Sequence, residues 1–172
     1  SLYLRALSIL EKNLGTNHPD TAILLEKLAS LYFIQGLYSK AEPLYLRALS
    51  IEEKTLGPDH PFTSQTVGAL ASLYKDQEKY SKAEPLYLRA LSIAEKTLGP
   101  DHPDTAAYIN NLANFYNSKG LFSKAESLYL RALSILERTT LGSDNVFIDR
   151  TLINLALNYS SQGLYEKAIP LM

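Results

Sequence analysis

The chain has 172 residues, 46% of them hydrophobic, which is enough material for an ordered core. Only 20% of the residues are charged and the formal net charge is −1, which excludes the basic footprint of a protein that binds nucleic acid or an anionic membrane. Cysteine is absent, which excludes disulfides and thiolate chemistry and favours a reducing compartment, so we expect a cytoplasmic location.

A thirteen-residue block recurs along the chain and organises it. The block SKAEPLYLRALSI occupies residues 39–51, returns unchanged at 81–93, and returns at 123–135 with Ser127 in place of proline. Residues 1–9 match the tail of the same block, and residues 167–171 begin it once more. Successive copies lie 42 residues apart, with one extra residue before the copy at 167–171. Such a period is typical of a repeat array, in which each repeat buries its apolar face by stacking on its neighbours.

The first complete repeat opens with a turn and a helix. Pro19 is placed for the first helical position, and Asp20 follows in the first turn, where the helix dipole favours negative charge. Four apolar residues then share one face at the helical period, namely Leu25, Leu28, Ala29 and Tyr32. Gly36 is suited to end this helix, because glycine accepts the left-handed conformation found just beyond helix ends.

The second helix of this repeat is predicted to begin at Ser39. Ser39 and Glu42 have the S-x-x-E spacing of a capping box, in which each side chain bonds an unpaired backbone N–H at the helix start. The apolar stripe of this helix consists of Ala41, Leu44, Tyr45, Ala48 and Leu49. Residues 56–58 end the helix, so each repeat is one helical hairpin.

The later repeats follow the same pattern with two departures. Their helices are predicted to begin near Pro61, Ser81, Pro103, Ser123 and Glu166. Glu78 stands where the other repeats have glycine, so this turn either holds a strained residue or changes its shape. The linker at 139–146 gains a residue and replaces His-Pro with Asn145 and Val146, so we expect a different stacking angle between the third and fourth repeats.

Three histidines recur at the 42-residue period, namely His18, His60 and His102. Zinc needs its donor atoms about 2 Å from one ion, whereas equivalent residues of adjacent repeats are separated by a helix-packing distance of roughly 10 Å. We therefore predict that these histidines satisfy helix N-termini and that no metal is bound. The sequence also has no catalytic constellation and no cofactor motif, so we expect neither an enzyme nor a cofactor.

The sequence thus predicts an all-α fold, a right-handed superhelical solenoid of antiparallel helix pairs. We expect one array over residues 1–172. Its parts are a half repeat at 1–13, whole repeats at 14–55, 56–97 and 98–140, and a partial repeat at 141–172. Because the chain opens in the middle of a repeat, we expect it to be a fragment of a longer protein.

Paired helices with small residues at their crossing points resemble the tetratricopeptide repeat. The alanines that match that family's positions of close approach are Ala29, Ala71, Ala113 and Ala156 in the first helices, with Ala41 and Ala48 in a second helix. The 42-residue period is similar to that of the kinesin light chain subfamily. The motifs that carry this likeness are LGPDHP at 56–61 and 98–103, NNLA at 110–113, and AEPLYLRAL at 41–49 and 83–91.

One face of each first helix differs from repeat to repeat, whereas the stacking positions recur. The resemblance implies that this face lines a concave groove that holds a peptide, and asparagine suits that role because it both donates and accepts hydrogen bonds. The candidate groove residues are Glu26, Lys27, Ser30, Phe33, Gln65, Ser72, Lys75, Asn110, Asn111, Asn114, Asn117, Arg150, Asn154 and Leu157. The alternative is that a solvated helix face varies freely once packing is satisfied.

The kinesin light chain likeness does not carry over to the ligand. Members that take acidic peptides use asparagines and basic residues in the groove, whereas here the matching position reads Lys27, Ala69, Asn111 and Asn154. The basic residues Lys27, Lys75 and Arg150 are offset by Glu26 and Asp76. An acidic peptide is therefore not favoured.

The predicted function is a non-catalytic protein–protein interaction module, with a protein or peptide partner and no nucleic acid or membrane partner. The alternative is a structural arm or self-assembling scaffold segment of a larger multidomain protein. Ser1 matches Ser127 and Met172 matches Tyr129 in the repeat, so head-to-tail association through the array ends is conceivable. Leucines lie off the main stripe of the second helices at Leu4, Leu46, Leu88 and Leu130, and we interpret them as half-buried surface residues rather than as an apolar ridge.

Overall fold

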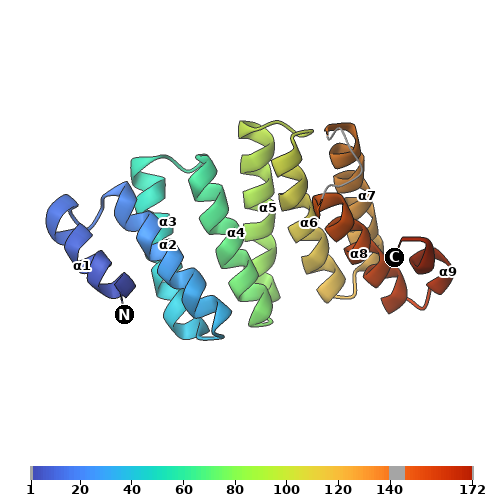
Figure 1. The fold of residues 1–172 in the computed structure, drawn as a ribbon, viewed down its shortest axis with the longest axis horizontal. Coiled ribbons are helices and arrows are strands. Elements are labelled where there is room, and N and C mark those ends of the chain that lie inside the picture. Colours follow the sequence, from blue (N-terminus) through green and yellow to red (C-terminus); the bar gives the residue numbers. More distant parts are fainter. Residues whose placement is uncertain (1, 140–145, 172) are drawn as a thin grey trace. The chain divides into compact units, whose positions relative to one another are not determined.

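The computed structural model describes residues 2–139 and 146–171, and these residues form helices and no strand. Figure 1 labels the helices in chain order. They are α1 (Leu2–Leu14), α2 (Pro19–Ile34), α3 (Tyr38–Thr55), α4 (Pro61–Asp76), α5 (Tyr80–Thr97), α6 (Pro103–Ser118), α7 (Phe122–Thr139), α8 (Val146–Ser161) and α9 (Tyr165–Ala168), followed by a 3₁₀ turn at Ile169–Leu171. The helices α2, α4, α6 and α8 are the first helices of the repeats, and α3, α5, α7 and α9 are the second.

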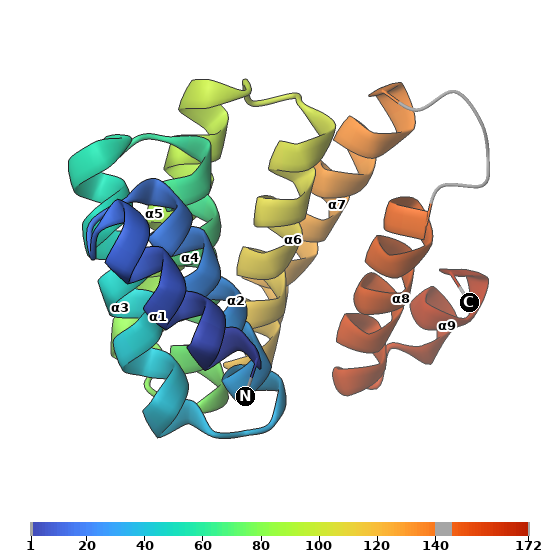
Figure 2. The ribbon, with the colours of Figure 1, turned by 60° about the vertical axis from the view of Figure 1, so that its left-hand side comes forward.

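The chain divides into two compact units, an N-terminal unit at Ser1–Ile93 and a C-terminal unit at Ala94–Met172. In the N-terminal unit α2 packs on α1, on α3 and on α4, and α3 also packs on α4. In the C-terminal unit α7 packs on α6 and α8, while α8 also contacts α6 and α9. Both views show α6 and α7 side by side as an antiparallel hairpin (Figure 1, Figure 2).

Small side chains allow the helices of each hairpin to approach closely. All six alanines predicted at the crossing points are buried, namely Ala29, Ala41, Ala48, Ala71, Ala113 and Ala156. Larger apolar side chains fill the space beside them, as in the cluster of Leu7, Leu25 and Ile51 in the N-terminal unit. The predicted stacking stripes of the first repeat are therefore buried, except that Tyr32 and Leu44 are half-buried.

The recurring histidines cap the first helices, as predicted. The Nδ1 atoms of His18, His60 and His102 accept the backbone N–H groups of Asp20, Phe62 and Asp104 at 3.2, 3.2 and 3.1 Å. Each of these helices then has proline in its first turn. The histidines thus satisfy donors that a helix start leaves unpaired.

The capping box predicted for Ser39 and Glu42 is wrong. Helix α3 begins at Tyr38 with Leu37 as its N-cap, and no side chain bonds the backbone there. Glu42 is used elsewhere, because its Oε1 atom accepts the hydroxyl of Tyr74 from the next repeat at 2.8 Å. The Glu42 carboxylate, which we predicted would cap its own helix, therefore joins two repeats.

Glu78 keeps the shape of the glycine turns. Its φ is +58°, close to the +70° of Gly36. In both turns the residue that follows donates its N–H to the tyrosine carbonyl four residues before the turn residue, from Lys79 to Tyr74 at 2.9 Å and from Leu37 to Tyr32 at 2.8 Å. The first of the two predicted alternatives, a strained non-glycine residue, is therefore the one observed. The prediction for the linker at 139–146 falls almost wholly outside the described residues.

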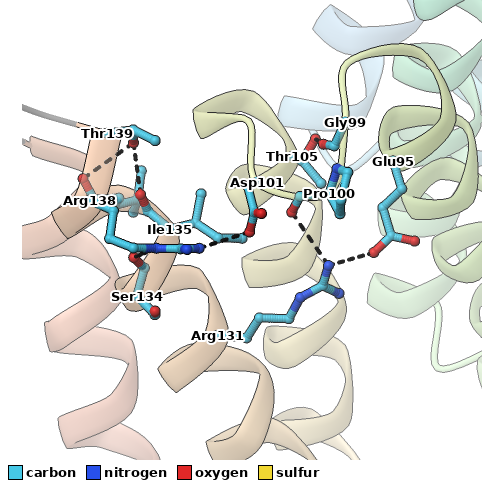
Figure 3. A network of polar contacts seen from close by, with 11 residues as sticks. Glu95, Gly99, Pro100, Asp101, Thr105, Arg131, Ser134, Ile135, Arg138 and Thr139 are labelled. Atoms are coloured by element: carbon cyan, nitrogen blue, oxygen red, sulfur yellow. Dashed lines mark hydrogen bonds and ion pairs between the residues drawn. The ribbon is translucent and has the colours of Figure 1, made fainter.

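An arginine in each of the second helices α3, α5 and α7 joins it to the preceding repeat. Arg131 lies 2.7 Å from the Glu95 carboxylate and donates to the carbonyl of Pro100 at 3.4 Å, as Figure 3 shows. In the N-terminal unit, Arg47 contacts Glu11 at 2.6 Å and Arg89 contacts Glu53 at 2.7 Å. We call this contact the arginine clamp.

Across the described ranges, no helix combines the length and the apolar character that crossing a bilayer requires.

Candidate functional site

The fourteen candidate residues lie on the first helices α2, α4, α6 and α8, and we call the helix face that carries them the groove face. Five of them point outward or stand half-buried and make no hydrogen bond or ion pair within the described part of the chain, namely Glu26, Lys27, Gln65, Asn111 and Leu157. They offer an amine, a carboxylate, amides and an aliphatic side chain to a partner.

Three candidates join the two helices of their own hairpin. The Ser30 hydroxyl lies 2.9 Å from the Tyr45 hydroxyl, and the hydroxyls of Tyr87 and Tyr129 donate to Ser72 at 3.0 Å and to Asn114 at 2.6 Å. Burial raises the pKa of all three tyrosines, to about 12 for Tyr87, so the phenols stay protonated. This position of the groove face therefore also supports the fold.

The asparagines of the C-terminal unit divide into inward and outward groups. Asn110 is only 2% exposed, and its side-chain oxygen accepts the amide of Asn154 at 3.3 Å. Asn117 accepts the amide of the buried Asn158 at 3.0 Å. Only Asn111 presents its whole amide outward, so it is the asparagine best placed to contact a partner.

The remaining three candidates make local contacts. The Phe33 ring lies 5.8 Å from that of Tyr38, and the Arg150 guanidinium lies 5.2 Å from the centre of the Phe147 ring. The Lys75 amine pairs with the carboxylate of its neighbour Asp76 at 3.0 Å.

A small crevice of about 10 Å³ lies between α6 and α8 on the groove face. It is lined by Pro103, Ala106, Ala107 and Asn110 from α6, by Leu136 from α7, and by Phe147, Arg150 and Thr151 from α8. Leu136 is the only lining residue from a second helix, so a second-helix side chain reaches the groove face at this point.

Sequence reasoning missed Glu52, which occupies the position of Leu136 in the N-terminal unit. Its side chain is 2% exposed, its Oε1 atom accepts the Thr66 hydroxyl at 3.0 Å, and its Oε2 atom has no hydrogen-bond partner. The pKa of Glu52 is raised to about 7, chiefly by burial and also by the charges of Glu26 and Glu53, while the hydrogen bond from Thr66 opposes the shift. The signal was available, because the same position reads Leu10, Ala94 and Leu136 in the other second helices.

Among residues 2–139 and 146–171, no group of three or more histidine, cysteine or acidic side chains is arranged to hold a metal ion.

A family model described as tetratricopeptide repeat matches residues 1–53, 20–96, 66–138 and 107–172, and so extends over the whole chain. No curated protein sequence matches it.

Two solved structures are similar in both fold and sequence. BtubC (BKLC) from P. vanneervenii is 28% identical, with a TM-score of 0.85 over 99% of this chain and 68% of that one. A kinesin light chain-type protein of Podosopora anserina with nearly identical TPR-like repeats is 27% identical, with a TM-score of 0.80 over 99% of this chain and 80% of that one. A Rap protein complexed with Competence and Sporulation Factor shares the fold alone, with 22% identity and a TM-score of 0.77 over 89% of this chain and 41% of that one.

These matches confirm the predicted fold class, an all-α solenoid of antiparallel helix pairs, and the resemblance to kinesin light chain-like repeats.

Proposed function

The chain belongs to the tetratricopeptide repeat family, whose repeats generally mediate protein–protein interactions, and from that premise we propose that it binds a peptide segment or partner protein along its groove face. The repeats of this family are typically non-catalytic interaction modules, and we propose the same for this chain. The repeat boundaries at 14–55, 56–97 and 98–140 remain predictions.

The observation that carries the proposal is the contrast between the groove face and the stacking stripes. The stripes are apolar and repeat from one hairpin to the next, whereas the groove face changes its chemistry in every first helix while keeping unpaired side chains. In the C-terminal unit the outward amide of Asn111 stands on α6, and the half-exposed Leu157 stands on the neighbouring α8. An amide and an aliphatic side chain on adjacent helices suit an extended peptide, whose backbone needs hydrogen bonds and whose side chains need apolar contact.

The test replaces these two side chains together. The double variant Asn111→Ala with Leu157→Ala removes groove contacts without removing a bond that supports the fold. The matched control is Leu130→Ala with Ser134→Ala on α7, because Leu130 is 49% exposed and Leu157 is 50% exposed. We expect affinity capture from the native source, read by quantitative mass spectrometry, to lose partners with the groove variant and to keep them with the control. Equal recovery by both variants, with equal helical circular dichroism, would show that the groove face is not the binding site.

A further inference from the structure

A buried carboxyl group in the N-terminal unit lacks one of its hydrogen-bond partners. The Oε2 atom of Glu52 has none, although the side chain is 2% exposed and its other oxygen is bound by Thr66. An unpartnered polar atom in a buried position costs free energy unless something binds it. The other second helices place an aliphatic residue here, so the fold itself does not need a carboxylate.

Glu52 lies on α3 with its carboxyl against Thr66 of α4, and the repeat makes it the equivalent of a residue that lines a crevice in the C-terminal unit. Its equivalent in the C-terminal unit, Leu136, lines the crevice between α6 and α8. The helices α2, α3 and α4 make the same pairwise contacts as α6, α7 and α8. Glu26 corresponds to Asn110 of the lining, and Thr66 to Thr151.

The charged groups around Glu52 include no cation that pairs with it. Helix α2 contributes Glu26, which is half-buried and has no ion pair or hydrogen bond in the described residues. Helix α3 contributes Glu53, which is already paired with Arg89, and α4 contributes the uncharged hydroxyl of Thr66. Both Glu26 and Glu53 raise the pKa of Glu52, as expected for acids that lie close together.

Two exposed side chains of the N-terminal unit, Ile23 and Gln65, occupy the repeat positions of Ala107 and Arg150. In the C-terminal unit an arginine thus lines the crevice together with the aliphatic Leu136. In the N-terminal unit the arginine's position holds a neutral amide, and the position of Leu136 holds the acidic Glu52.

We propose that the crevice formed by Glu26, Glu52 and Thr66 binds the ammonium or guanidinium group of a lysine or arginine side chain in a bound peptide. The proposal rests on the proposed function, since the peptide lies along the groove face. A basic side chain supplies the donor that Glu52 lacks and the charge that Glu26 and Glu52 together require. A divalent cation is a poorer match, because calcium takes six to eight oxygen ligands and the described residues contain no cluster of three acidic or histidine side chains.

The experiment selects a library of random twelve-residue peptides, displayed on phage, against three forms of the chain. These are the wild type, Glu52→Leu, which copies the residue of the equivalent position in α7, and Glu26→Gln. We expect peptides from the wild type to share a lysine or arginine at one position. With either variant that preference should disappear while peptides are still enriched.

A double-mutant cycle then measures the contact. The selected peptide and a version with norleucine in place of its basic residue are titrated against the wild type and Glu52→Leu. We expect the replacement to weaken binding on the order of tenfold or more with the wild type, as for a charge-assisted hydrogen bond, and to have little effect with the variant.

The outcomes separate the two proposals. If the enriched peptides show no preference for a basic residue, or if that preference persists with Glu52→Leu, the proposal that the crevice binds a basic side chain is wrong. The proposed groove function would not be affected. If no peptide is enriched with the wild type, the result counts against the groove function and removes the premise of the crevice. Circular dichroism of each variant confirms that it is folded.

Discussion

At the scale of single residues, Glu52 is the main departure from an otherwise apolar interior. Its carboxyl lies between α3 and α4 with one oxygen bound and the other unbound. Replacing Glu52 with an apolar residue of similar size is expected to stabilise the fold. The replacement removes the cost of burying a carboxyl group, and it loses only one hydrogen bond, the one from Thr66. Glu52 thus lowers stability and is not needed for the fold, which is consistent with a role in binding.

The raised pKa of Glu52 predicts that stability falls as the pH rises. The folded chain holds the proton up to a pH of about 7, whereas the unfolded chain releases it near 4.5, so the contribution is fully present below 4.5 and is lost between 4.5 and 7. Between pH 4.5 and 7 we expect the free energy of unfolding of the wild type to fall by about 3 kcal/mol relative to that of Glu52→Gln, since each unit of pKa shift corresponds to about 1.4 kcal/mol. Urea denaturation of both proteins at pH 4.5 and 8 measures the difference. A difference in stability that stays constant with pH would contradict it.

At the scale of the helix and its turn, Glu78 gives a direct comparison with the glycine turns. Glu78 has a φ of +58° at the end of α4, where the equivalent Gly120 has +71°. No atom lies within 4 Å of the position that a Cβ atom would occupy at Gly120, so the two turns differ in backbone strain and not in crowding.

We expect Glu78→Gly to stabilise the chain by about 1 kcal/mol, because glycine removes the left-handed strain at some cost in unfolded-state entropy. The matched change Gly120→Glu should destabilise it by a similar amount. Urea midpoints at one pH measure both. If the urea midpoint shifted in the same direction in both variants, the stability of these turns would not depend on the left-handed backbone conformation.

Local elements could be predicted from the sequence, whereas contacts between repeats could not. The histidine caps and the turn residues depend on neighbours a few positions away, so spacing was sufficient to find them. The capping box failed because Glu42 binds Tyr74, a residue 32 positions later. Asn110 and Glu52 are buried by adjacent helices, and the pattern within one helix does not reveal which of its residues a neighbour covers.

At the scale of the whole molecule, both units are built from the same contacts repeated along the chain. Tyrosine hydroxyls bind a glutamate of the preceding second helix, from Tyr74 to Glu42 and from Tyr159 to Glu126, in each unit. Interactions of this kind extend only to the next repeat, so stability is expected to be a sum of repeats and nearest-neighbour interfaces. The contacts that build the fold are therefore the same in both units, and in our proposal specificity depends on the groove-face positions that differ.

The arginine clamp makes the length of the array adjustable in whole repeats. In every clamp the arginine contacts the same two groups of the preceding repeat, a glutamate side chain near the end of a helix and a backbone carbonyl in the turn that follows. A second copy of residues 56–97 inserted after Thr97 would therefore bring its own arginine to Glu95, where Arg131 now lies, and would present its own glutamate to Arg131. Such a chain is expected to melt at a higher temperature with proportionally more helix, and a lower melting temperature would contradict this. Growth by duplication of one repeat thus needs no new interface.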